Sequence, residues 1–107
     1  MPQRGDIYWI KLDPTIGSEI KKTRPAVILS NNAQNQQEHH YVIAPITSKT
    51  EKLYPFEALL EVNEQRGKAL LDQVRTVSHK RIGSWLGRIS QKEMRGIERA
   101  LKLVLSL

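Results

Sequence analysis

The sequence predicts a mainly β domain, a small antiparallel barrel or sandwich, that ends in one α-helix. Three observations support this fold class. Short segments of strand-forming residues recur along the chain, turns containing Gly and Pro separate them, and the last segment changes to helical spacing. The length of 107 residues suits one core, so we expect a single domain over residues 1–107.

The first half of the chain contains three expected strands. Residues 7–12 are rich in strand-forming residues and stop at the turn signal Asp13-Pro14. Residues 15–23 are read as a mobile loop. Residues 25–29 form a continuous apolar run, typical of a strand buried on both faces, which Pro25 can open but not occupy centrally. Residues 31–40 form a polar loop without a core-forming face, and residues 41–44 form a strand that ends at Pro45.

The second half contains further strands and the helix. We expect strands over residues 56–62 and 85–89, and either two strands or one bent strand over residues 69–71 and 74–77. Ser90 and Glu93 have the spacing of a capping box, which marks a helix start. Apolar residues then follow helical spacing: Met94, Ile97, Leu101 and Val104.

Composition excludes several classes of function. The chain has no cysteine, so it has no disulfide framework, thiolate metal site or cysteine nucleophile. It has no apolar run of the ~20 residues that a membrane span needs. The polar start, MPQRGD, lacks a secretion signal, so we expect a cytoplasmic protein. The adjacent His39 and His40 have no carboxylate at ligand spacing, so we expect no metal. The chain has no Gly-rich phosphate loop of the Walker or dinucleotide type, and we expect no cofactor.

The net charge of +6 suggests a polyanionic partner, of which nucleic acid is the commonest. An acidic protein or a membrane surface would also fit. The charge is uneven: residues 1–65 carry 7 basic and 8 acidic side chains, whereas residues 66–107 carry 10 basic and 3 acidic ones. The basic character therefore belongs to the second part of the chain.

Two stretches next to buried strands carry candidate functional groups. A loop with Glu19, Lys21 and Lys22 leads to Arg24, whose planar guanidinium suits phosphate oxygens, although a structural pair with a nearby carboxylate is the alternative. Thr47 and Ser48 follow the strand over residues 41–44, where their hydroxyls can bind a phosphate or cap a turn.

A third candidate lies further along the chain. Asp72 and Gln73 follow an apolar segment and place an acceptor and an amide at its edge, and Arg75 either faces outward or pairs with Asp72.

The sequence resembles the MazF/PemK/Kid family of toxin endoribonucleases over nearly its whole length. Five stretches in the family's order carry the resemblance: Arg4-Gly5-Asp6-Ile7-Tyr8; Asp13-Pro14 with Gly17-Ser18-Glu19; Arg24-Pro25-Ala26-Val27-Ile28-Leu29-Ser30; Pro45-Ile46-Thr47-Ser48; and Asp72-Gln73-Val74-Arg75-Thr76-Val77. The resemblance implies an SH3-like barrel that works as a homodimer. It also implies metal-independent cleavage of single-stranded RNA at a short sequence, leaving a 2′,3′-cyclic phosphate and a 5′-hydroxyl. An antitoxin would keep the enzyme silent.

The resemblance also implies roles for single residues. The family's catalytic arginine falls on Arg24 and its catalytic threonine on Thr47, while Glu19 and Asp72 fall where relatives place acid/base or RNA-contacting groups. Some relatives have an arginine two residues before that aspartate, where this chain has Leu70. Glu19 is therefore our preferred base and Asp72 the second choice.

The remaining predictions concern RNA binding. We expect Lys21, Lys22, Lys49 and Lys52, with Arg81 a further candidate, to line a basic groove. Tyr54 and Phe56 are candidates for stacking on bases, with a place in the core as the alternative for each. Trp9 and Trp85 are assigned to core or dimer packing. We expect an acidic antitoxin segment to bind the same cationic surface.

Two other functions stay open from the sequence. Related barrels of the CcdB type bind DNA gyrase and cleave nothing, and a C-terminal helix is shared with them. A non-catalytic barrel that binds nucleic acid through its basic face is the second alternative. The Arg24 and Thr47 pair favours the ribonuclease, because a gyrase-binding protein does not require it.

Overall fold

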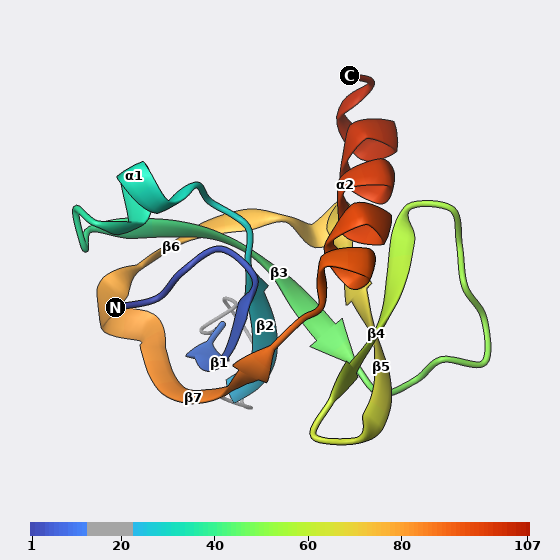
Figure 1. The fold of residues 1–107 in the computed structure, drawn as a ribbon, viewed down its shortest axis with the longest axis horizontal. Helices are drawn as coiled ribbons and strands as arrows, with labels where there is room; N and C mark the ends of the chain where they lie inside the picture. Colours follow the sequence, from blue (N-terminus) through green and yellow to red (C-terminus); the bar gives the residue numbers. More distant parts are fainter. Residues whose placement is uncertain (13–22) are drawn as a thin grey trace, which may run out of the picture.

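The structure, a computed structural model, describes residues 1–12 and 23–107. Its strands are β1 (Asp6–Lys11), β2 (Thr23–Ile28), β3 (His40–Thr47), β4 (Glu57–Val62), β5 (Gln65–Leu70), β6 (Arg75–Ser78) and β7 (Ile82–Arg88). Its helices are α1 (Asn32–Asn35), the short 3-10 helices η1 (Leu71–Gln73) and η2 (His79–Arg81), and α2 (Gln91–Leu105). Figure 1 shows the strands curling round a common interior, with α2 standing beside β4.

All strand pairs in the described residues are antiparallel. The order is β4-β5-β3-β2-β1-β7, and β6 pairs with β3 outside this path. Helix α2 packs against β4 and η1. The predicted fold class, an antiparallel β-structure with a C-terminal helix, is confirmed.

Strand β3 runs through Pro45, so the expected strand end there is wrong. The strand pairs with β6 from His40 to Ile43 and with β5 at Ile46 and Thr47. Pro45 lies where β3 changes partner, so its missing N–H removes no bond from either ladder. The change of partner extends β3 as far as Thr47.

Pro25 is also inside a strand rather than at its start. Strand β2 begins two residues earlier, at Thr23, and Pro25 is paired with Trp9 of β1, whereas pairing with β3 begins at Ala26. At Pro25 the strand therefore has one recorded neighbour, which a proline tolerates.

The polar segment over residues 31–40 contributes to the interior after all. Asn31 caps α1 by accepting the Gln34 N–H, and Asn35 is fully buried. The Asn35 amide donates to the Ser30 carbonyl at 2.9 Å, and its oxygen accepts the Ser30 hydroxyl at 2.5 Å. A buried amide is tolerated because its polar atoms are bonded.

The chain over residues 65–78 forms two strands, not one bent strand, because η1 separates β5 from β6. Strand β5 starts four residues before the expected apolar segment. It forms a hairpin with β4, in which Val62 pairs with Gln65. Strand β7 likewise starts at Ile82, three residues before the expected start.

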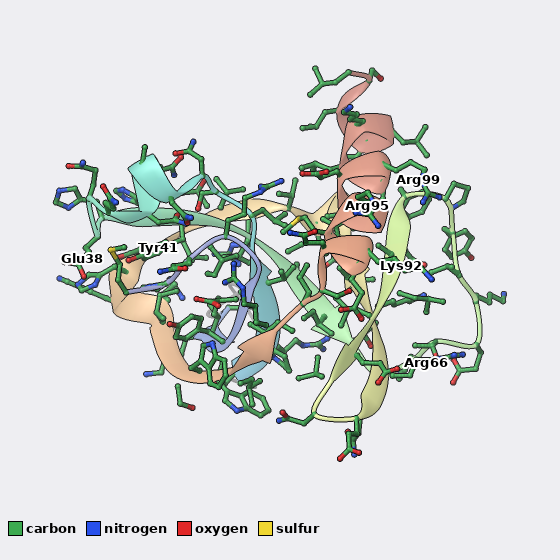
Figure 2. All side chains as sticks on the ribbon, in the orientation of Figure 1. Glu38, Tyr41, Arg66, Lys92, Arg95 and Arg99 are labelled. Atoms are coloured by element: carbon green, nitrogen blue, oxygen red, sulfur yellow. The ribbon has the colours of Figure 1, made fainter. Side chains whose placement is uncertain are left out.

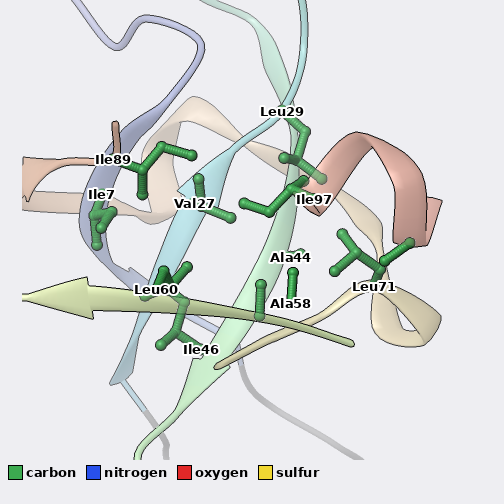
Figure 3. Close-up of a cluster of buried hydrophobic side chains, with 12 residues drawn as sticks. Ile7, Val27, Leu29, Ala44, Ile46, Ala58, Leu60, Leu71, Ile89 and Ile97 are labelled. Atoms are coloured by element: carbon green, nitrogen blue, oxygen red, sulfur yellow. The ribbon is translucent and has the colours of Figure 1, made fainter. Parts of the chain in front are cut away.

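The buried side chains form two clusters on opposite sides of the sheet. The larger one joins β-strand residues to the inner face of α2 (Figure 3), and its members include Val27, Ala44, Leu60, Leu71 and Ile97. The smaller one contains Ile10, Ala26, Ile28, Tyr41, Ile43 and Val77. Because β2 and β3 supply alternate residues to both clusters, both strands are buried on both faces, which the continuous apolar run over residues 25–29 predicts for β2.

Helix α2 begins as the sequence predicts. The Ser90 hydroxyl accepts the Glu93 N–H at 3.1 Å, and the Glu93 carboxylate accepts the Ser90 N–H at 2.8 Å. Ile97 and Ala100 are buried, and Met94, Leu101 and Val104 are half-buried against the larger cluster. None of the helices in the described ranges is long and apolar enough for a membrane span.

Candidate functional site

Arg24 and Thr47 are brought together by the pairing of β2 with β3. The recorded register pairs Ala26 with Pro45 and Val27 with Ala44. Extended by two residues, the same register places Arg24 opposite Thr47. Directly opposite residues of an antiparallel pair project from the same face, with Cβ atoms ~5 Å apart. Both side chains accordingly line one pocket.

The pocket has a volume of about 490 Å³, within the ~300–1,000 Å³ range of ligand sites. Its lining comes from β1, β2, β3 and the turn after it, the β4–β5 hairpin and β7: Trp9, Arg24, Pro25, Ile46, Thr47, Ser48, Lys49, Val62, Asn63, Gln65, Arg66, Gly67 and Leu86. Four of the residues predicted from the sequence as site residues are therefore in one place, namely Arg24, Thr47, Ser48 and Lys49. We call this cavity the Arg24–Thr47 pocket.

The Thr47 hydroxyl is oriented by the turn that follows β3. Its oxygen accepts the backbone N–H of Lys49 at 3.2 Å. A hydroxyl that accepts one bond still has its own proton to donate. Thr47 therefore caps the turn and also remains a donor at the pocket wall.

Arg24 is half-buried, and within residues 1–12 and 23–107 its side chain makes no hydrogen bond or ion pair. The structural pairing with a carboxylate that the sequence left open is thus not found in this part of the chain. A guanidinium that is partly removed from water and unpaired is available to an anion.

Neither tryptophan belongs to the buried core. Trp9 is 38% exposed and lines the Arg24–Thr47 pocket, and Trp85 is 58% exposed on β7. Core packing is therefore wrong for both, while dimer packing stays a prediction. The pairing of β1 with β7 contains register shifts on both sides of Tyr8, which alter the simple alternation of inward and outward residues.

Sequence reasoning missed the pocket residues of the β4–β5 hairpin. Asn63, Gln65 and Arg66 lie at its tip and are exposed, and Gly67 follows. The two-residue turn Asn63-Glu64 lacks the glycine that usually announces such hairpins. Asn63, four residues before Gly67, is the available sequence signal of this turn, and it is a weak one.

The loop between β3 and β4 is fixed by a buried ion pair. Lys68 Nζ lies 2.8 Å from the Glu57 carboxylate and donates to the Lys52 carbonyl at 2.7 Å. Glu57 also accepts the Tyr54 N–H at 2.9 Å. Burial raises the pKa of the Glu57 carboxyl, but the Lys68 and Tyr54 hydrogen bonds and the Lys68 charge outweigh it and hold the pKa below its usual value.

Tyr54 and Phe56 stack on each other, with ring centroids 5.2 Å apart and planes 3° from parallel. Tyr54 is 47% exposed, and Lys68 Nζ lies 5.9 Å from its ring centroid. Neither ring lines the Arg24–Thr47 pocket. Their role in binding bases, like that of the exposed Lys52, stays a prediction.

Asp72 and Gln73 are exposed in η1, beyond the end of β5 that lies farthest from the hairpin tip. The structure does not bring them into the Arg24–Thr47 pocket. Arg75 donates to the Leu12 carbonyl at 3.1 Å rather than pairing with Asp72, and Arg81 donates to the Lys11 carbonyl at 3.2 Å. The predicted Glu19, Lys21 and Lys22 lie outside the described residues.

The described part of the chain contains no group of three or more His, Asp or Glu side chains suited to a metal ion. The chemistry of the pocket is instead that of an anion site, with a guanidinium, two hydroxyls and two further cations, Lys49 and Arg66, around a partly apolar floor.

Comparison with known proteins identifies the family. A family model described as PemK-like, MazF-like toxin of type II toxin-antitoxin system matches residues 3–105. The chain belongs to this family. It is 35% identical to the endoribonuclease MazF9 of Mycobacterium tuberculosis, covering 100% of this chain and 98% of that protein. It is 34% identical to the endoribonuclease toxin MazF of Escherichia coli K12, covering 98% and 95% respectively.

Solved structures of an endoribonuclease and of a MazF protein have the same fold. A mycobacterial endoribonuclease in complex with its cognate antitoxin superposes with a TM-score of 0.84 at 27% identity, over 100% of this chain and 97% of that one. MazF from Deinococcus radiodurans gives a TM-score of 0.83 at 27% identity, over 99% and 97%. The expected MazF-type barrel is thereby confirmed, and the Arg24–Thr47 pocket is a feature of a MazF-like toxin.

Proposed function

We propose that this MazF-like toxin cuts single-stranded RNA in the Arg24–Thr47 pocket. The chain belongs to a family of toxins, and its relatives are named endoribonucleases. We assign the same activity to this chain. The observation that carries the assignment of the site is that one cavity holds a donor hydroxyl and an arginine that has no partner in residues 1–12 and 23–107. Both groups are suited to a phosphodiester.

The nucleophile in this reaction comes from the RNA. The ribose 2′-oxygen bonds to the adjacent phosphorus, the bond from phosphorus to the 5′-oxygen breaks, and the products are a 2′,3′-cyclic phosphate and a 5′-hydroxyl. A base takes the 2′-proton, and the departing 5′-oxygen receives one. No protein nucleophile is required, which is consistent with a chain that lacks cysteine.

Arg24 stabilises the charge that develops on the phosphate oxygens. A preorganised donor of this kind commonly contributes ~3–4 kcal/mol to the transition state. A guanidinium keeps its protons in proteins, so an electrostatic role suits Arg24 better than an acid role. Thr47 donates its hydroxyl proton to a phosphate oxygen, and Ser48 is placed to hold another.

Glu19 is the preferred general base and Asp72 the second. The exposed position of Asp72 outside the pocket favours Glu19 over it. A carboxylate base must lie close to the 2′-hydroxyl to act near neutral pH. Lys21, Lys22, Lys49 and Lys52 bind the RNA backbone on either side of the cut.

The partners follow from the family. The toxin acts in the cytoplasm as a homodimer, and a cognate antitoxin with an acidic segment silences it. A solved relative is described as an endoribonuclease in complex with its cognate antitoxin. Trp85, 58% exposed on β7, is a large apolar side chain suited to a subunit interface.

The Arg24–Thr47 pocket favours the ribonuclease over the first of the two alternatives. A CcdB-type gyrase-binding toxin has no use for a ligand-sized cavity that presents an arginine without a partner among the described residues. A non-catalytic barrel would bind RNA with a steep salt dependence and yield no product. The endoribonuclease relatives favour the catalytic function over both.

The test is cleavage of a long defined RNA in EDTA, with the matching DNA as control. We expect the wild-type protein to cut the RNA and spare the DNA, because DNA lacks the 2′-hydroxyl. Arg24→Ala should lower the rate at least about a hundredfold. Dependence on added metal, or full activity of Arg24→Ala, would contradict the proposal.

A further inference from the structure

The tip of the β4–β5 hairpin, residues 63–66, is a rigid element beside the catalytic groups. Strands β4 and β5 are joined by Asn63 and Glu64, with φ of 50° and 67°. Positive φ at both central residues is what a type I′ turn requires, and this turn matches the twist of the flanking strands. A two-residue turn of this kind has little freedom to move relative to its strands.

Strand pairing fixes the distance of the hairpin tip from Thr47. Strand β5 pairs directly with β3, with Thr47 opposite Lys68 and Ile46 opposite Ala69. A Cβ atom at Gly67 would lie 3.2 Å from the Thr47 carbonyl oxygen and 3.1 Å from Ile46 Cγ2. Glycine at this position therefore lets the hairpin approach the catalytic strand closely.

Three side chains of the hairpin tip are left available to a ligand. Asn63, Gln65 and Arg66 line the Arg24–Thr47 pocket, and all three are exposed. None of their side chains bonds to another described residue. Figure 2 shows Arg66 at the hairpin, on a different element from the basic residues of α2.

We propose that the hairpin tip reads the nucleotide next to the cleaved phosphate. Gln65 and Asn63 carry amides, each with donors and an acceptor, which match the edge of an unstacked base. Arg66 binds the phosphate of the same nucleotide. The inference rests on the proposed function, because it places the scissile phosphate between Arg24 and Thr47.

The assignment rests on a difference between two sets of groups in the Arg24–Thr47 pocket, those on β2 and β3 and those on the hairpin tip. The groups on β2 and β3 are a guanidinium and hydroxyls, which bind any phosphate and carry no sequence information. Selection of a sequence requires groups that discriminate between base edges. Among the described residues that line the pocket, only Asn63 and Gln65 carry amide side chains.

The test compares hairpin variants on oligoribonucleotides that differ by one base on either side of the cut. Gln65→Ala should relax the base preference at one flanking position by about 5- to 100-fold, the usual range for losing a bidentate base contact. Gln65→Glu retains the shape but removes the amide donors, so it should alter the preferred base. Asn63→Gly removes the second amide and tolerates the positive φ, which alanine would not.

Arg66→Ala tests the phosphate contact. We expect a 3- to 10-fold higher KM with unchanged kcat, and a salt dependence of log KM that is lower in slope by about 0.7. Arg95→Ala is the matched control, because it removes the same charge from an exposed position on α2 outside the pocket. It should leave the base preference and the slope unchanged.

The outcomes separate this inference from the proposed function. A wild-type protein that cuts RNA, with hairpin variants that keep its base preference within about twofold, would overturn the role of the hairpin alone. A wild-type protein that cuts no RNA would overturn the proposed function, and the role of the hairpin with it. Thermal unfolding of each variant shows whether the fold is retained.

Discussion

Two cations flank Thr47, and they serve different purposes. Arg24 lies on the β2 side, half-buried and without a partner among the described residues. Lys68 lies on the β5 side, directly opposite Thr47, with its side chain 10% exposed and 2.8 Å from a Glu57 carboxylate that is 6% exposed. A charge that is satisfied inside the fold holds the structure, whereas a charge left unsatisfied at a cavity is available to a ligand.

The largest expected effect comes from breaking the satisfied pair. Lys68→Met leaves the Glu57 carboxylate buried without its cation, so the free energy of unfolding should fall by about 3–5 kcal/mol. Denaturant unfolding at pH 7 measures this change. Arg24→Met is the control and should lower the free energy of unfolding by less than about 1 kcal/mol. Among the described residues Arg24 has no ion-pair partner that the substitution would leave unpaired.

A double variant sharpens this result. Adding Glu57→Leu to Lys68→Met removes the unpaired carboxylate, so much of the lost stability should return. If Lys68→Met and Arg24→Met destabilise the protein equally, the distinction between the two cations is wrong.

The next effect concerns Arg24 alone. Arg24→Lys keeps the positive charge but loses the planar fork that binds two phosphate oxygens at once, so kcat should fall about 10- to 100-fold. Stability should not change measurably. Steady-state cleavage of a short oligoribonucleotide gives kcat, and a variant as fast as the wild type would mean that Arg24 acts as a simple point charge.

Thr47 should show a smaller effect. Thr47→Val is nearly isosteric but removes the hydroxyl, and the loss of one hydrogen bond to a charged group should lower kcat about tenfold. Thr47→Ser retains the hydroxyl and is the matched control, with activity within about threefold of wild type. Equal rates for the Val and Ser variants would restrict the Thr47 hydroxyl to capping the Lys49 turn.

The sequence predicts those parts of the site that follow strong local signals. Arg24 and Thr47 lie next to continuous apolar runs. The position of a residue next to a buried strand is set largely by that strand. The start of α2 is equally local, because Ser90 and Glu93 satisfy each other within one turn.

The parts that the sequence does not predict depend on long-range pairing. Lys68 is buried only because β5 places it against Glu57, 11 residues away in the chain. Trp9 is typical of a core residue by type, yet register shifts between β1 and β7 accompany its exposure at the pocket. Gln65 and Arg66 enter the site through a register that joins β5 to β3, which no local pattern reveals.

The smallest expected effect is the pH dependence of the stability that Glu57 contributes through its ion pair with Lys68. Because the folded protein holds the pKa of Glu57 below its usual value, the ionised carboxylate contributes stability above the unfolded pKa of about 4.3. This contribution is lost as the pH falls through the lowered pKa. The stability difference between wild type and Glu57→Gln should therefore be constant from pH 7 to about 5 and shrink below about 4.

The matched control for this titration is Glu51→Gln, since Glu51 is exposed and unpaired among the described residues. Its stability difference from wild type should stay small at every pH, because an exposed carboxylate with no ion pair among the described residues contributes little to stability. Denaturant unfolding at several pH values between 3 and 7 measures both differences. A Glu57 difference that grows as the pH falls would mean that burial outweighs the Lys68 pair, and Lys68 would then stabilise the fold less than its geometry indicates.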